Sequence, residues 1–129
     1  MKSITIEGRI SSGEGVGSQF VKLPWVEKQF EEKLGFIPYS GTLNIRLSHG
    51  VDISKLKNAE KRIRINSLKG LLGGWCFKAL IMKRLWGAIV VPDVQEYPDD
   101  LLEILAPVNL RKTLGLKDGM EIEITVWLE

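Results

Sequence analysis

Short runs in which apolar and polar residues alternate recur along this chain, and they limit its fold more than any other feature of the sequence. The first run, in residues 1–10, places Ile4, Ile6 and Ile10 at even positions. This spacing of two is typical of a strand with one buried face. The last run, EIEITVW, follows an Asp-Gly turn and alternates in the same way. The sequence therefore predicts strands at both ends of the chain.

The middle of the chain adds further strands and a few short helices. GTLNIRL returns to the period of two, and KRIRINSL, GGWCFKALIM and RLWGAIVVP are interpreted as strands separated by glycine-containing turns or bulges. PWVEKQFEEKLG has Pro24 in its first turn, apolar residues at helical spacing and Gly35 at its end, so a helix is predicted there. We also expect a helix in YPDDLLEILAP, capped by Asp99, and a short helical turn in NLRKTLG.

These elements predict a mainly β fold, a compact β-barrel with short helices inserted between its strands. The length of 129 residues suits one ordinary domain and is enough to bury a core. We therefore expect residues 1–129 to form a single domain.

Charge, cysteine content and hydropathy exclude several functional classes. The 18 basic and 16 acidic residues nearly cancel, so the chain lacks the strong positive field of a dedicated nucleic-acid-binding protein. One cysteine, Cys76, and one histidine, His49, provide neither a disulfide framework nor a structural zinc site. The most apolar stretch, GAIVVP, is too short to cross a bilayer, and the N-terminus lacks the apolar segment of a signal peptide. We expect a cytoplasmic protein with no membrane partner.

The segment SSGEGVGSQF is a candidate phosphate-binding loop. Gly13, Gly15 and Gly17 occupy every second position, which allows consecutive backbone N–H groups to form an anion-binding nest. A flexible hairpin connection is an equally good interpretation, because a glycine-rich loop alone is a weak signal. The glycine spacing fits neither the P-loop nor the Rossmann motif.

Thr42 and Asn44 in GTLNIRL place a hydroxyl and an amide oxygen on the same side of a strand, opposite Leu43 and Ile45. Hard cations accept such ligands, and Mg²⁺ in phosphate-transfer sites takes much of its coordination from water and substrate phosphates. The alternative is an ordinary solvated strand face, where threonine and asparagine are common.

Other polar residues allow a functional and a plain interpretation. Glu103, in the apolar context LLEILAP, could accept a proton or bond a ligand hydroxyl, or it could lie on a helix surface. Arg111 could meet a phosphate or cap a carbonyl. The run KRIRI, with Lys61, Arg62 and Arg64, could touch RNA, but it contains no interleaved aromatic residue and is interpreted as a solvated edge. The tryptophans are interpreted as core or rim residues, although one beside the site could cover a flat ring: Trp25, Trp75, Trp86 and Trp127.

Four segments together resemble the archaeal CTP-dependent riboflavin kinases in order and spacing over nearly the whole chain. They are the glycine loop, LGFIPYSGTLNIRL, GAIVVP and LLEILAPVNLRKTLGLKDGMEIEI. The most specific parts are LGF-x-PY-x-GTLN and, further along, E-I-x-AP-x-x-LR. The resemblance implies a six-stranded cradle-loop barrel of the riboflavin kinase type. It also implies transfer of the γ-phosphate of CTP to the ribityl 5′-hydroxyl of riboflavin, with FMN and CDP as products.

The resemblance also implies a role for each site residue. Thr42 and Asn44 match the family's Mg²⁺ ligands, and Gln95 and Glu103 fall on the flavin side. Glu103 is the catalytic candidate, with the hypothesis that it orients and deprotonates the attacking hydroxyl. The positions that match nucleotide-binding residues are Gly13, Glu14, Gly15, Val16, Gly17, Ser18, Gln19, Val108, Asn109, Leu110 and Arg111.

Two other functions stay open at this stage. Val16 and Ser18 stand where relatives usually carry a glutamate and a larger or basic residue. A non-catalytic barrel that senses flavin or nucleotide, or binds nucleic acid, is therefore one alternative, since fold alone does not fix function. A kinase that uses another nucleotide or acceptor is the second. We expect a monomer that uses riboflavin, CTP and Mg²⁺, binds no nucleic acid and has no N-terminal helix-turn-helix domain.

Overall fold

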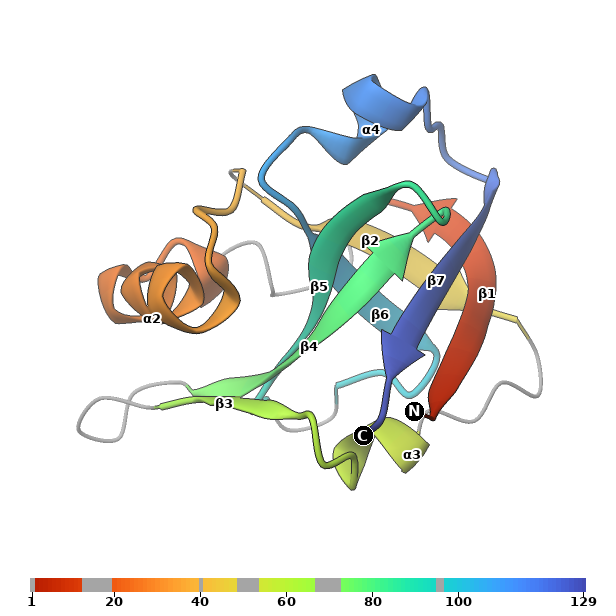
Figure 1. Ribbon diagram of the computed structural model, residues 1–129. Coiled ribbons are helices and arrows are strands. Elements are labelled where there is room, and N and C mark those ends of the chain that lie inside the picture. The colour runs from red at the N-terminus through yellow and green to blue at the C-terminus, as the bar shows by residue number, and fades with distance from the viewer. Residues whose placement is uncertain (1, 13–19, 40, 49–53, 67–72, 95–96) are drawn as a thin grey trace.

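The computed structural model describes residues 2–12, 20–39, 41–48, 54–66, 73–94 and 97–129, and most of their regular structure is β (Figure 1). The strands are β1 (Ser3–Ser11), β2 (Leu43–Leu47), β3 (Ile63–Ile65), β4 (Gly74–Ile81), β5 (Leu85–Pro92), β6 (Leu101–Leu105) and β7 (Glu121–Trp127). The helices are α2 (Pro24–Leu34), α3 (Ser54–Lys57) and α4 (Leu110–Leu114). None of the described helices is long and apolar enough to cross a membrane.

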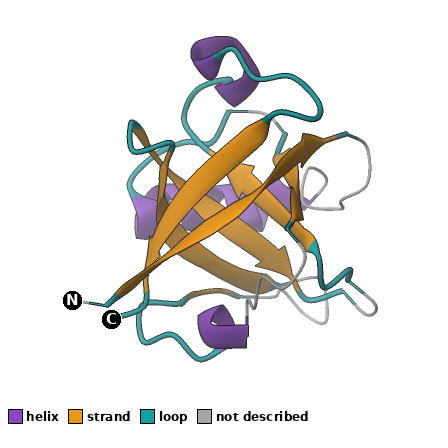
Figure 2. Cartoon of the chain, turned by 90° about the vertical axis from the view of Figure 1, so that its right-hand side faces the viewer, coloured by secondary structure: helices purple, strands orange, loops and turns teal. Residues whose placement is uncertain are grey.

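Six of the strands close into an antiparallel barrel in the order β4-β5-β6-β2-β1-β7, and β7 pairs back with β4. The closing pairs join Ala79–Ile81 of β4 to Ile124–Val126 of β7. The short strand β3 pairs with the other end of β4, where Ile63 lies opposite Cys76. Figure 2 shows α4 at one end of this barrel and α3 at the other. The predicted six-stranded barrel is confirmed.

Two apolar clusters stabilise the barrel, one on each side of β4, β5 and β6. The inner cluster fills the barrel with side chains that point inward from every second position of the strands. Ile6, Ile45 and Ile104 are among them. The outer cluster packs α2 against the sheet through side chains such as Phe30 and Val90. Burial of these apolar surfaces is the main favourable contribution to folding.

Helix α2 begins and ends where the sequence predicts. Pro24 occupies its first turn, where a missing N–H group removes no helical hydrogen bond. Gly35 ends the helix in the left-handed conformation, with φ of 84°, and its N–H group donates to the carbonyl of Glu31. The apolar face that contains Val26 and Phe30 is buried, as the helical spacing predicts.

The predicted helix in residues 97–107 is wrong, because Leu101–Leu105 form strand β6 and Asp99 lies in the turn before it. All residues of this strand are buried. Ile104 points into the barrel, whereas Leu105 packs into the cluster below α2. A strand buried on both faces is a continuous apolar run, and its pattern does not differ from that of a buried helical turn.

Candidate active site

A buried carboxylate, Glu103 on β6, accepts hydrogen bonds from residues in the segments before β2 and before β6. Thr42 Oγ1 donates a hydrogen bond of 2.8 Å to Glu103 Oε1, and Tyr97 Oη donates one of 2.6 Å to Oε2. Asn44 lies directly opposite Glu103 in the pairing of the two strands. The side chain of Glu103 has no exposed surface. Two hydroxyl donors therefore compensate for water that burial removes from this carboxylate.

The alternation of β2 determines how these residues meet. Leu43 and Ile45 point into the barrel core, and Thr42 and Asn44 point the other way, as predicted. This opposite face is half-buried, so a solvated strand face is the wrong interpretation for this pair. The reason is that β1 and β6 flank β2 on either side, with Ser11 and Glu103 opposite Asn44.

Asn44 carries a buried oxygen without a partner. Its Oδ1 atom is covered and finds no hydrogen-bond donor within the described part of the chain, and the same holds for Ser11 Oγ. A buried acceptor that lacks a donor costs about 1–3 kcal/mol. A bound cation or a ligand donor would satisfy the oxygen of Asn44, so this arrangement can accommodate one.

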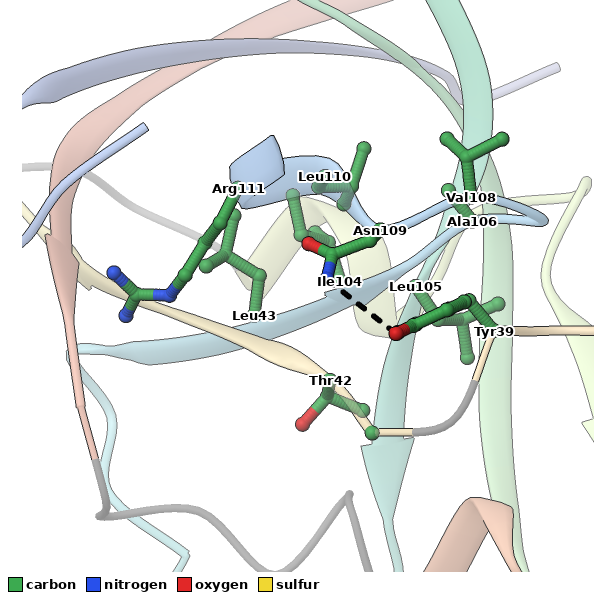
Figure 3. A pocket seen from close by; sticks show the side chains of 11 residues that line it. Tyr39, Thr42, Leu43, Ile104, Leu105, Ala106, Val108, Asn109, Leu110 and Arg111 are labelled. Carbon is green, nitrogen blue, oxygen red and sulfur yellow. Dashed lines mark hydrogen bonds between the residues drawn. The ribbon is translucent and has the colours of Figure 1, made fainter. Parts of the chain in front are cut away.

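A cavity of about 180 Å³ opens beside Thr42 and below α4 (Figure 3). Its walls come from the segment before β2, from the end of β6 and from the start of α4. The lining residues are Tyr39, Gly41, Thr42, Leu43, Ile104, Leu105, Ala106, Val108, Asn109, Leu110 and Arg111. The fold thus brings the predicted metal ligand Thr42 and the predicted nucleotide segment Val108–Arg111 to one cavity. Glu103 adjoins this cavity through its hydrogen bond to Thr42.

The start of α4 is fixed by Asn109. Its Oδ1 atom accepts a hydrogen bond of 3.1 Å from the N–H group of Lys112 and caps the helix. Its amide nitrogen lies 3.5 Å from the hydroxyl of Tyr39, which it approaches across the cavity in Figure 3. Gly115 ends the helix with φ of 66°. The predicted helical turn is confirmed, and its cap positions the cavity wall.

Arg111 connects α4 to the end of β1. Its Nη2 atom donates to Asp118 Oδ1 at 2.7 Å, to Ser12 Oγ at 3.1 Å and to the carbonyl of Ser11 at 3.2 Å. The hydroxyl of Ser12 also donates to Asp118. The Ser12 hydroxyl and the Arg111 guanidinium hold the pKa of Asp118 below its usual value. Arg111 is therefore held beside Ser12, the last described residue before the glycine-rich segment.

Tyr97 is a site residue that the sequence analysis did not identify. Burial, and then the hydrogen bond and negative charge of Glu103, raise the pKa of its phenol above the usual range. Tyr97 therefore stays protonated and remains a donor to Glu103. Its role depends on the path of β6, which was predicted as a helix, so no local pattern identified it. Tyr39 and Asp118 were also missed, although Tyr39 belongs to the quoted motif LGF-x-PY-x-GTLN.

The remaining predicted site residues, Gly13–Gln19 and Gln95, lie outside the described residues. Their assignments therefore stay predictions. Within the residues that are described, no cluster of three or more His, Cys, Asp or Glu side chains could hold a metal ion. Any cation near Glu103 would thus depend on neutral oxygens as well as carboxylate.

The fold places the chain in the class of closed antiparallel β-barrels, here with a cavity between β2, β6 and α4. A family model named CTP-dep_RFKase, described as a domain of unknown function, DUF120, matches residues 10–126. The chain belongs to this family, and the resemblance seen in the sequence is confirmed at that level.

Curated relatives are similar to this chain over almost all of its length. The riboflavin kinase of Methanococcoides burtonii is 42% identical over 127 residues, which cover 95% of this chain and 57% of that protein. The riboflavin kinase of Pyrobaculum islandicum is 38% identical, with 98% of this chain and 62% of that protein covered. For the riboflavin kinase of Archaeoglobus fulgidus the identity is 39%, with 98% and 56% covered. The chain therefore spans little more than half the length of these relatives.

Proposed function

We propose that this chain is a riboflavin kinase that transfers the γ-phosphate of CTP to the ribityl 5′-hydroxyl of riboflavin and releases FMN and CDP. The observation that carries the proposal is the buried Glu103, bonded to Thr42 at the edge of a cavity whose opposite wall is Val108–Arg111. The names of the curated relatives support riboflavin as the acceptor. The name of the family model supports CTP as the donor.

The residues beside Glu103 fit a Mg²⁺ ion. Thr42 uses its proton in the hydrogen bond to Glu103, so the lone pairs of its oxygen remain for a cation. The buried Oδ1 of Asn44 has no donor within the described residues and would be satisfied in the same way. Mg²⁺ tolerates few protein ligands when phosphates and water complete its shell. When bound, it would neutralise charge on the phosphoryl group during transfer.

Glu103 and the cavity walls would position the substrates. The hydrogen bonds from Thr42 and Tyr97 fix the carboxylate of Glu103 at the edge of the cavity. A ribityl hydroxyl held there would be aligned with the γ-phosphate, which is most of what phosphoryl transfer requires of a protein. We assign Val108–Arg111 and Gly13–Gln19 to the nucleotide, and Gln95 to the flavin. We further propose that residues 1–129 fold as one domain, and that the protein is cytoplasmic and monomeric.

The first experiment is to incubate the purified chain with riboflavin, Mg²⁺ and each of the four nucleoside triphosphates in turn, and to separate the flavins by chromatography. FMN formed with CTP alone is the expected result. FMN formed with another triphosphate would retain the kinase and contradict the proposed donor. Folded protein that forms no FMN with any triphosphate would contradict the kinase and favour a binding barrel without catalysis.

Variants at the proposed metal site give a second test. The double variant Thr42→Ala with Asn44→Ala should lower the rate of FMN formation by about a hundredfold or more, the scale of a lost charge-stabilising contact. Thr113→Ala is the matched control, since Thr113 is exposed on α4. An unchanged rate in the double variant would contradict the metal assignment.

For Glu103→Gln, weaker riboflavin binding with unchanged turnover would exclude a role as general base.

A further inference from the structure

Two tryptophans meet on the outer surface of the barrel. Trp86 on β5 is 57% exposed, which is high for so large an apolar side chain. Trp127 on β7 is half-buried, and the centroids of the two rings are 5.4 Å apart with an interplanar angle of 36°. Strand β4 lies between them, since it pairs with β5 on one side and with β7 on the other (Figure 1). The fold therefore presents an aromatic surface that leaves much of Trp86 in water.

Basic side chains surround this pair. Lys78 projects from the outer face of β4, and Lys61 and Arg62 lie in the segment before β3. That segment is held against the end of β7, because the N–H group of Lys61 donates to the carbonyl of Leu128. The guanidinium of Arg62 donates to the carbonyl of Ala59 and lies 5.0 Å from the ring centre of Trp75. Arg62 is thus a cation in a defined position.

Together these side chains line a cavity of about 640 Å³, which we call the aromatic-basic cavity. Its lining residues are Glu60, Lys61, Arg62, Ile63, Lys78, Trp86 and Trp127. Three are cationic and one is anionic, so the cavity favours an anion. Its volume is in the range of sites for small organic ligands. None of the residues described as lining it belongs to the cavity below α4.

We propose that the aromatic-basic cavity binds a nucleobase that carries a phosphate, either as a free nucleotide or as one unit of a single-stranded nucleic acid. The base would stack on the exposed face of Trp86, and Lys61, Arg62 and Lys78 would contact the phosphate. The run KRIRI has no aromatic residue within it, which argued against such binding. Folding supplies the missing aromatic side chains, Trp86 from β5 and Trp127 from β7.

The test is fluorescence anisotropy with a short fluorescein-labelled oligoadenylate, with unlabelled adenosine monophosphate as competitor. The wild-type chain should bind the oligonucleotide, and the affinity should fall as salt increases. Trp86→Ala should weaken binding about tenfold, as expected for one lost stacking contact. Trp86 is exposed, so this variant should fold, and circular dichroism checks it.

Lys78→Glu, with Lys28→Glu as matched control, keeps the proposal falsifiable if Trp86→Ala does not fold. Both lysines are exposed and both variants change the net charge equally, but Lys28 lies on α2, outside the cavity. Lys78→Glu should weaken binding about tenfold or more and Lys28→Glu should not.

The competitor distinguishes the two sources of the ligand. Displacement of the oligonucleotide by adenosine monophosphate would support a site for a single nucleotide, and binding without displacement would support a single-stranded nucleic acid. Absence of binding for both ligands, or equal losses in Lys78→Glu and Lys28→Glu, would overturn the proposal. Because the readout is binding and not FMN formation, the result does not depend on the proposed kinase activity.

Discussion

Glu103 combines complete burial with hydrogen bonds from two hydroxyl groups. Thr42 and Tyr97 each engage one carboxylate oxygen. A buried carboxylate that loses a donor keeps the penalty of desolvation without its compensation. The two hydroxyl groups should therefore contribute to stability as well as to substrate positioning.

Tyr97→Phe removes one of these donors and keeps the aromatic ring. We expect the free energy of unfolding to fall by about 1–3 kcal/mol, because the buried carboxylate loses one of its hydrogen-bond donors. Tyr39→Phe is the matched control, since Tyr39 is 50% exposed and its hydroxyl makes only a long contact of 3.5 Å with the described residues. Urea unfolding measures both variants, and equal effects would contradict the role assigned to Tyr97.

Cys76 gives a pH-dependent prediction. Burial raises the pKa of its thiol from 9.0 to about 12, and the positive charge of Lys33 offsets only part of this rise. Between these pH values the unfolded chain releases a proton that the folded chain retains, so stability falls as pH rises. Above pH 9.0, the unfolding free energy of the wild-type chain should therefore fall relative to that of Cys76→Ala. The expected loss is about 1.4 kcal/mol per pH unit.

Urea unfolding of both proteins at about pH 8 and about pH 10 checks this expectation. The comparison with Cys76→Ala removes the titration of lysines and tyrosines, which both proteins share. A constant difference in unfolding free energy between the two proteins at the two pH values would contradict it. The thiol should also resist alkylation until the chain is unfolded, because the thiolate is the reactive form.

At the scale of elements, glycine marks a position where two strands approach closely. A Cβ atom at Gly87 on β5 would lie 2.4 Å from the carbonyl oxygen of Leu105 on β6 and 2.7 Å from the side chain of Ile81. Gly87→Ala should therefore lower the free energy of unfolding by about 3 kcal/mol through overpacking. At Gly35 a Cβ atom would meet nothing within 4 Å, and Gly35→Ala should lose only about 1 kcal/mol from its left-handed backbone. Thermal unfolding of both variants distinguishes steric from conformational effects, and comparable losses would refute the close approach.

Strand β6 explains which elements could be predicted from sequence and which could not. The half-buried strands β1, β2 and β7 were predicted correctly because alternation reports one buried face. Helix α2 was predicted from Pro24, Gly35 and its apolar spacing. Strand β6 has both faces buried, so its burial depends on α2 and on the barrel, which are distant in the sequence. The predicted helix failed because local pattern does not contain that information.

The same limit applies to the candidate site. Thr42, Asn44, Glu103 and Arg111 stood out in the sequence by their chemistry and by the motifs around them. Their partners did not, because the register between β2 and β6 places Asn44 opposite Glu103 and only the folded chain brings Asp118 to Arg111. Candidate side chains could thus be selected by residue type and motif, and their hydrogen bonds could not be predicted.

At the scale of the whole molecule, the cavity below α4 exists only when the barrel is closed. Its walls come from the segment before β2, from β6 and from α4, and the pairing of β4 with β7 completes the barrel that holds these parts together. A ligand of this cavity should therefore bind the folded chain and not the unfolded one. Ligand binding and global stability are then thermodynamically linked.

This linkage gives a prediction that tests the assignment of substrates without measuring turnover. A ligand present at about a hundred times its dissociation constant should raise the free energy of unfolding by about 2.7 kcal/mol. Riboflavin alone, and CTP with Mg²⁺ alone, should each raise the thermal midpoint. The Thr42→Ala and Asn44→Ala double variant should lose most of the increment from CTP with Mg²⁺ and keep that from riboflavin, whereas Thr113→Ala should keep both. If the double variant retained the full increment from CTP, the nucleotide would bind away from Thr42 and Asn44, and the cavity below α4 would lose its assignment as the donor site.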